Sequence, residues 1–131
     1  MFKFPSDLGC VKEASKEVLA SLEDLKLNAS VLFDIRLCFE EAFINAVKYG
    51  NQFDKRLTVD VDIVKKENYF EIAVYDRGKG FDLDSVQNPT QDVNLMKLSG
   101  RGLFLIKTLM DQVTYEKGKT CNCLRMVKKI R

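Results

Sequence analysis

Two neighbouring stretches of the chain alternate between apolar and polar residues, and this alternation constrains the fold more than any other feature. In residues 57–63, leucine, valine and isoleucine alternate with threonine and aspartate. In residues 70–74, phenylalanine, isoleucine and valine alternate with Glu71 and Ala73. Because successive side chains of a strand point to opposite faces, each stretch predicts a strand with one buried face. The polar residues 65–68 predict the turn, so the two strands form a half-buried hairpin.

Two helices are predicted before this hairpin. Apolar residues recur at three- and four-residue spacing in residues 8–26, and Ser6 can cap the helix that this spacing predicts. A second helix is predicted over residues 29–49. Gly50 and Asn51 follow it, and both residue types accept the left-handed conformation that ends many helices.

The second half of the chain predicts a loop, a helix and two strands. Residues 80–99 are polar and irregular, and a loop of this length inside a compact domain is typical of a lid or a binding loop. A third helix is predicted over residues 101–110. Two closing strands are predicted near residues 113–115 and 121–128.

Length and composition favour one globular domain over residues 1–131. The chain is 46% hydrophobic and 31% charged, which excludes a disordered or collagen-like protein. Its apolar runs are far shorter than the roughly 20 residues of a membrane span, and its first residues lack the features of a secretion signal. We therefore expect a cytoplasmic protein that does not contact a membrane.

The net charge of +2 is too small to indicate a nucleic-acid-binding protein. The charge is uneven, because residues 1–100 carry 13 basic and 17 acidic residues, whereas residues 101–131 carry eight and two. The basic end could bind an anion, or it could consist of a charged hairpin turn and a solvated tail. The four cysteines contain no C-x-x-C pair, and without any histidine they do not predict a zinc site.

Polar side chains share one sector of the second predicted helix. At 100° per residue, Asp34, Glu41, Asn45 and Lys48 lie within about 60° of one another, between apolar flanks. Glu41 stands one helical turn before Asn45. The sector is either a functional surface or a partly exposed helix edge.

Two glycine-containing segments complete the candidate site. In residues 75–81 a strand ends on Asp76 and runs into Gly78 and Gly80, which allow a flat ligand to approach the main chain, although a simple turn could use the same residues. In residues 99–103 Arg101 and its flanking glycines open the third helix. Free N–H groups at a helix start bind anions, so this segment is either a phosphate site or a glycine-rich helix cap. It is not a Walker A loop.

Together these segments resemble a known family. Residues 41–46, 76–81 and 99–103 resemble, in order and spacing, the N box and the two glycine boxes of the Bergerat-fold ATPases, the superfamily of gyrase, the heat-shock chaperone and histidine kinases. The chain is most similar to the anti-sigma-factor serine/threonine kinases, because it consists of the ATPase domain alone and carries Glu41 at the base position. The resemblance implies a two-layer α/β (α+β) sandwich. Its mixed, mostly antiparallel sheet carries one layer of helices and an ATP lid at about residues 80–99.

The resemblance also implies roles for individual residues. Asn45 would coordinate the Mg²⁺ that bridges the ATP phosphates, Glu41 would be the general base, and Asp76 would accept a hydrogen bond from the adenine amino group. The residues implied to bind the nucleotide are Asn45, Lys48, Asp76, Gly78, Gly80, Gly100, Arg101, Gly102, Leu103 and Thr120.

The function implied by the resemblance is that of a Mg-ATP-dependent protein kinase. It would phosphorylate a small anti-sigma antagonist protein on serine or threonine and sequester a sigma factor in another complex, as a homodimer without direct nucleic-acid contact. Two alternatives keep the same nucleotide cleft. They are a non-catalytic ATP-gated regulatory module and the detached catalytic domain of a histidine kinase, and a structural domain without nucleotide is a third alternative.

Overall fold

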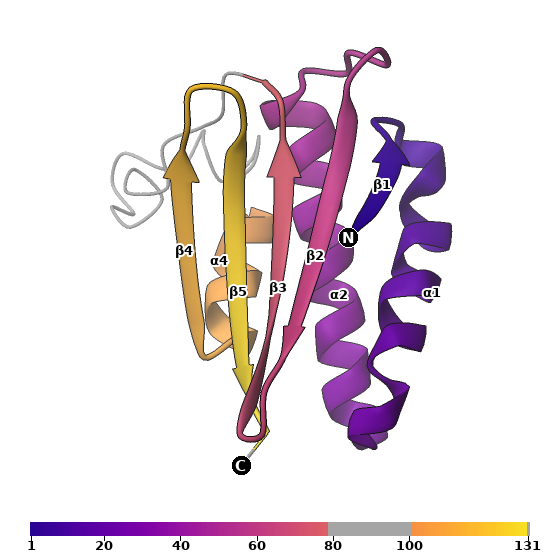
Figure 1. Ribbon diagram of the computed structural model, residues 1–131, viewed down its shortest axis with the longest axis vertical. Coiled ribbons are helices and arrows are strands. Elements are labelled where there is room, and N and C mark those ends of the chain that lie inside the picture. The colour runs from indigo at the N-terminus through magenta and orange to yellow at the C-terminus, as the bar shows by residue number, and fades with distance from the viewer. Residues whose placement is uncertain (79–100, 131) are drawn as a thin grey trace.

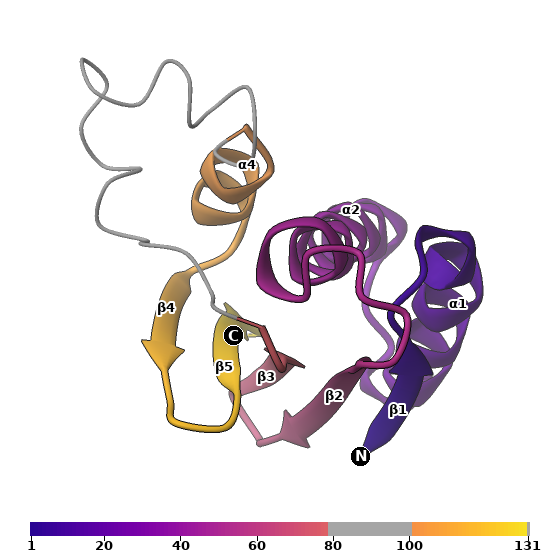
Figure 2. The same cartoon turned by 90° about the horizontal axis from the view of Figure 1, so that it is seen from above.

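The computed structural model describes residues 1–78 and 101–130, with only the main chain of Arg101. The lid expected at about residues 80–99 lies outside the described residues. In the part of the chain that is described, no helix is both long and apolar enough to cross a bilayer. The expected two-layer α+β sandwich is confirmed, with a sheet on one side and helices on the other (Figures 1 and 2).

The described residues contain a five-stranded sheet in the order β1-β2-β3-β5-β4. Every pairing among these strands is antiparallel, where the resemblance implied a mixed but mostly antiparallel sheet. Apolar residues at alternate positions of the strands belong to the buried core, and no helix among the described residues covers the opposite face of the sheet (Figure 2). The strands are β1 (Phe2–Pro5), β2 (Thr58–Lys65), β3 (Tyr69–Asp76), β4 (Gln112–Lys117) and β5 (Asn122–Lys129).

Among the described residues, three α-helices lie side by side on one face of the sheet, with α2 in the middle (Figure 2). They are α1 (Val11–Ser21), α2 (Ala29–Asn45) and α4 (Arg101–Leu109). Short helical turns flank them: η1 (Leu8–Cys10), η2 (Glu23–Leu25) and the π-helical η3 (Ala46–Gly50). This layer places the two helices that carry the predicted N box and second glycine box next to each other.

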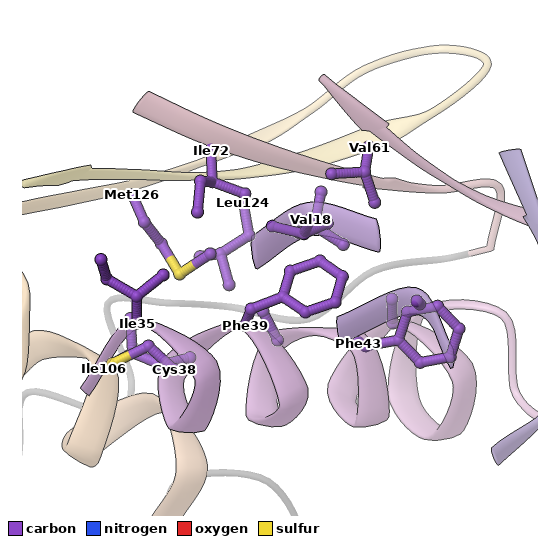
Figure 3. Packing of buried hydrophobic residues seen from close by; sticks show 14 of the residues in the cluster. Val18, Ile35, Cys38, Phe39, Phe43, Val61, Ile72, Ile106, Leu124 and Met126 are labelled. Atoms are coloured by element: carbon purple, nitrogen blue, oxygen red, sulfur yellow. The ribbon is translucent and has the colours of Figure 1, made fainter. Parts of the chain in front are cut away.

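The hydrophobic core fills the space between α2 and the sheet (Figure 3). Phe39 and Phe43 of α2 are almost completely buried there, in the same cluster as Ile72 of β3 and Met126 of β5. Burying a large apolar side chain stabilises a fold by roughly 1.5–3 kcal/mol. The core therefore fixes α2, and with it the polar sector of α2, against the centre of the sheet.

The predicted hairpin is confirmed, since β2 and β3 pair with Val61 opposite Val74 and Ile63 opposite Ile72. The start of the chain differs from the prediction. Residues 2–5 form an edge strand against β2, with Phe4 opposite Val59. The helix prediction at this end was therefore incomplete, because it did not include a strand before the helix.

The cap of the first helical segment is also different. The side chain of Asp7 accepts a hydrogen bond from the Gly9 N–H at 2.9 Å. The predicted cap, Ser6, is buried and instead accepts a hydrogen bond from Asn51 at 3.0 Å. This hydrogen bond therefore connects the end of β1 with Asn51, the residue that follows η3.

The second helix ends in a π-turn and not in the predicted left-handed cap at Gly50 and Asn51. The Asn51 N–H donates to the carbonyl oxygen of Ala46 at 2.7 Å, which is the five-residue spacing of a π-turn. The left-handed residues are Gln52 and Phe53, with φ of 53° and 62°, and not the predicted Gly50 and Asn51. Gly50 is instead needed for its close approach to the end of β3, described below.

Candidate functional site

Glu41 and Asn45 of α2 face the first turn of α4. A Cβ atom at Gly102 would lie 2.5 Å from Glu41 Oε2 and 3.3 Å from Asn45 Nδ2. Glu41 is half-buried and Asn45 is buried. The glycine therefore allows the start of α4 to approach both polar side chains, and the first main-chain N–H groups of an α-helix have no partner within the helix.

The side-chain nitrogen of Asn45 is buried and has no hydrogen-bond partner among the described residues. Buried polar groups in native proteins almost always have a partner, so this amide fits a site that a ligand completes. The described residues contain no group of three or more His, Cys, Asp or Glu side chains that could hold a metal ion. An ion here would need most of its ligands from elsewhere, which suits Mg²⁺ with its retained waters and phosphate oxygens.

Asp76 ends β3 and is buried, with 3% of its surface exposed. Its Oδ1 atom accepts hydrogen bonds from Asn122 Nδ2 at 2.8 Å and from the Gly78 N–H at 3.1 Å. Burial raises the pKa of this carboxyl group, and the two hydrogen bonds only partly oppose that effect. Among the described residues no donor is bonded to the second oxygen, Oδ2, so this atom can accept a hydrogen bond from a ligand.

Asn122 belongs to the candidate site, although the sequence motifs do not predict this. It opens β5 directly opposite Asp76 in the sheet register, and it donates a second 2.8 Å hydrogen bond to the Gly78 carbonyl oxygen. The amide thus holds both the carboxylate and the glycine that follows it. One sequence feature could have identified it. Asn122 is a polar residue at the alternate position that puts it on the same strand face as the buried, apolar Leu124 and Met126.

Two glycines bring the end of the second helix against the end of β3. A Cβ atom at Gly50 would overlap the carboxyl group of Asp76, and one at Gly78 would overlap the carbonyl oxygen of Gly50. Both positions therefore require glycine for close packing within the protein. The sequence predicts Gly78 for ligand approach or for a simple turn, and packing against Gly50 is a further reason for glycine there.

A small pocket joins the two halves of the candidate site. Asn45 and Asp76, which are far apart in the sequence, both line it, and its volume is about 10 Å³. This is room for a water molecule and not for a purine, so the pocket can form only the floor of a nucleotide site. The lining residues are Ala42, Asn45, Ala46, Val74, Asp76, Tyr115 and Leu124.

Other predicted nucleotide-binding residues lie in varied places. Lys48 is half-buried in η3, with Nζ 5.9 Å from the ring centre of Tyr49. Leu103 is completely buried in the core, so only its main chain could contact a ligand. Thr120 is exposed in the turn before β5, two residues from Asn122. Their roles stay predictions.

Three further predicted residues receive little or no structural description. Gly80 and Gly100 lie outside the described residues, and the side chain of Arg101 does as well. The main chain of Arg101 forms the first residue of α4. This is the position that the proposed phosphate-binding helix start requires.

Comparison with known proteins identifies the family of this chain. Residues 4–128 match the model of the family described as histidine kinase-like ATPase domain. The serine-protein kinase RsbW of Listeria monocytogenes is 32% identical over 93 residues, which cover 65% of this chain and 59% of that protein. RsbW of Bacillus subtilis is 34% identical over 86 residues, which cover 61% and 54%. The chain thus spans less than two thirds of these relatives.

A solved structure shows the same fold. In the crystal structure of the SiaB-SiaC complex from Pseudomonas aeruginosa, one chain matches 96% of this chain and 86% of its own length. The TM-score is 0.71 and the sequence identity is 19%. The match of the family model over almost the whole sequence shows that this chain belongs to the histidine kinase-like ATPase domain family.

Proposed function

From this family membership we propose that the protein is a serine/threonine protein kinase that uses Mg-ATP. The observation that carries the proposal is the approach of Gly102 to both Glu41 and Asn45. A carboxylate that would serve as the base, an amide that would bind the metal and a helix start suited to phosphate are therefore close together. The serine-protein kinase names of the similar RsbW proteins support the same activity.

The described residues would bind the two ends of the nucleotide separately. Asp76 would accept a hydrogen bond from the adenine amino group through Oδ2, and it would disfavour guanine, which carries a carbonyl group at that position. Asn45 would hold Mg²⁺ through its amide oxygen, and the ion would neutralise charge on the phosphates. The main-chain N–H groups of the first turn of α4 would bind the phosphate oxygens.

Glu41 would act on the acceptor protein. It would take the proton from a serine or threonine hydroxyl group as the oxygen of that group bonds to the γ-phosphorus. The bond from phosphorus to the bridging oxygen would break at the same time, and ADP would leave with the electron pair. Glu41 lies one helical turn from Asn45, so the base and the metal ligand would act on the same phosphoryl group.

The partners are proposed from the same family resemblance. The protein would phosphorylate a small antagonist protein and would hold a sigma factor in a separate complex, acting as a homodimer in the cytoplasm. ATP and ADP would favour different partners because only ATP offers a γ-phosphate to the site. The similar Pseudomonas aeruginosa structure is that of a SiaB-SiaC complex, which supports protein assembly by a protein of this fold.

The proposal can be tested by capturing partners from the lysate of the source cells with Mg-ATP and, separately, with Mg-ADP. Captured proteins are analysed by mass spectrometry for phosphoserine, phosphothreonine and phosphohistidine. Three baits are compared: the unchanged protein, Glu41→Gln and Glu40→Gln. Glu40 is a matched control, because it is the neighbouring half-buried glutamate on a different side of α2.

The proposal predicts a small protein that is phosphorylated with ATP by the unchanged bait and by Glu40→Gln. Glu41→Gln should bind ATP but should give little or no phosphorylation. Nucleotide-dependent partners without phosphorylation would indicate the non-catalytic module instead. A partner phosphorylated on histidine would indicate the detached histidine kinase domain.

A further inference from the structure

Asn51 uses both ends of its side chain inside the protein. The residue is buried, with 2% of its surface exposed. Its Nδ2 atom donates to Ser6 Oγ at 3.0 Å and to the Thr58 carbonyl oxygen at 3.1 Å. Its Oδ1 atom accepts the N–H of Arg77 at 2.6 Å. One carboxamide therefore connects the ends of β1, β2 and β3 at the edge of the candidate site.

The hydrogen bond to Arg77 fixes the main chain directly after Asp76. Arg77 stands between Asp76, which is proposed to bind adenine, and Gly78, which packs on the carbonyl group of Gly50. Holding the Arg77 N–H limits rotation of the peptide that follows Asp76. The direction of the Asp76 carboxylate depends on this peptide as well as on the Asn122 amide.

A buried carboxylate anchors the side chain of Arg77 on the other side. Arg77 Nη2 lies 2.9 Å from Asp60 Oδ2, and Asp60 also accepts hydrogen bonds from Thr58 at 2.9 Å and Lys3 at 3.3 Å. Burial alone would raise the pKa of Asp60, but these donors hold it below its usual value. Arg77 is thus held at its main chain by Asn51 and at its guanidinium group by Asp60.

We propose that Asn51 is a positioning residue for adenine recognition. It acts through the Arg77 N–H and aims Oδ2 of Asp76 at the amino group of the base. The inference rests on the proposed ATP-binding function and adds a residue on which the preference for adenine depends. Asn51 itself would not contact the nucleotide.

The test compares ATP with purine riboside triphosphate, which differs by lacking the 6-amino group. Dissociation constants for both nucleotides are measured by calorimetry with Mg²⁺ at a temperature where each variant is folded. The variants are Asn51→Ala, Asn51→Asp and Asn28→Ala. Asn28→Ala is the matched control, because it also removes a hydrogen-bonding amide, at the exposed cap of α2 far from the site.

The unchanged protein should prefer ATP by about tenfold or more, as expected for a hydrogen bond to a charged group. Asn51→Ala should reduce this preference to about twofold or less, whereas Asn28→Ala should keep it, although both lower the melting temperature. Asn51→Asp retains an acceptor for the Arg77 N–H and should keep the preference at a reduced melting temperature.

The outcomes separate this inference from the proposed function. If the unchanged protein binds neither nucleotide, the proposed function fails. If it prefers ATP and Asn51→Ala keeps that preference, only the role of Asn51 is overturned. Loss of the preference in Asn51→Asp would also overturn the role, because that variant keeps the acceptor for Arg77. The measurement on Asn51→Asp can therefore overturn the role of Asn51 even if Asn51→Ala does not fold.

Discussion

Gly102 and Glu41 lie so close together that a methyl group on the glycine would come within 2.5 Å of Oε2 of the glutamate. The two residues belong to different helices, α4 and α2, and their approach determines how near the start of α4 comes to the polar sector of α2. The pair therefore links the proposed catalytic base to the proposed phosphate site. Its consequences can be measured in variants that leave the fold intact.

Gly102→Ala should reduce phosphoryl transfer by about tenfold or more, because small displacements of reacting groups have large kinetic effects. Thermal stability should change little, since alanine favours a helix over glycine by about 1 kcal/mol and offsets part of the steric conflict. Gly9→Ala is the control, because an added Cβ there would meet only Asp7 at 3.4 Å. Unchanged turnover in Gly102→Ala would show that the close approach is not needed for activity.

Asn122→Ala should lower the free energy of unfolding by about 1.5–3 kcal/mol, the usual contribution of a hydrogen bond to a charged group. The loss leaves the buried Asp76 carboxylate without its side-chain donor. Urea denaturation measures the effect, and Asn68→Ala in the exposed turn between β2 and β3 serves as the control. The effect should shrink when Asp76→Asn is already present, and full additivity of the two changes would contradict the contact.

Acidification should weaken ATP binding beginning above pH 3.8, the ordinary pKa of an aspartate, because the pKa of Asp76 is raised by burial. The ionised carboxylate accepts the adenine amino group, and protonation removes that acceptor. The effect on stability has the opposite sign. A raised pKa in the folded state stabilises the fold at acid pH, and this contribution is lost as the pH rises through the folded pKa.

This pH dependence is measured by ATP titrations and denaturant unfolding over the same pH series. Asp76→Asn should remove the contribution of this group from both profiles. Binding and stability curves that are the same in Asp76→Asn as in the unchanged protein would exclude Asp76 as their source.

The cysteines should differ in their reaction with thiol reagents. Burial raises the pKa of Cys38 to about 12 and also raises the pKa of Cys123, so neither forms the reactive thiolate at pH 8. Cys10 and Cys121 are half-buried. Labelling of the folded protein with a thiol-reactive dye should modify these two first, and Cys38 and Cys123 only after unfolding. Equal rates at all four thiols would contradict this ordering.

Patterns with a short period were sufficient to predict the main elements. The alternation in residues 57–63 and 70–74 predicted β2 and β3, and the helical spacing over residues 29–49 predicted α2 with its continuation in η3. Strand and helix periods are properties of consecutive residues. A sequence displays them without any knowledge of what packs against them.

The edge strand β1 and the cap of the first helical segment were not predictable in this way. Residues 2–5 are too few to show a clear alternation and include Pro5, which is uncommon inside strands. They become a strand because β2 offers a free edge, where Phe4 meets Val59. Ser6 then accepts a hydrogen bond from Asn51 in the interior, and Asp7 instead caps the first helical segment.

The sequence by itself determined the order of the main elements after β1 and the residue types of the candidate site, including Glu41, Asn45 and Asp76. Only the tertiary structure decided which side chains support them. Asn122 reaches Asp76 through the register of β3 with β5, and Asn51 reaches Arg77 where three strand ends meet. The physical reason is the separation of the residues along the sequence. Periodicity is a property of neighbouring residues, whereas these contacts depend on strand register and helix packing between distant parts of the chain.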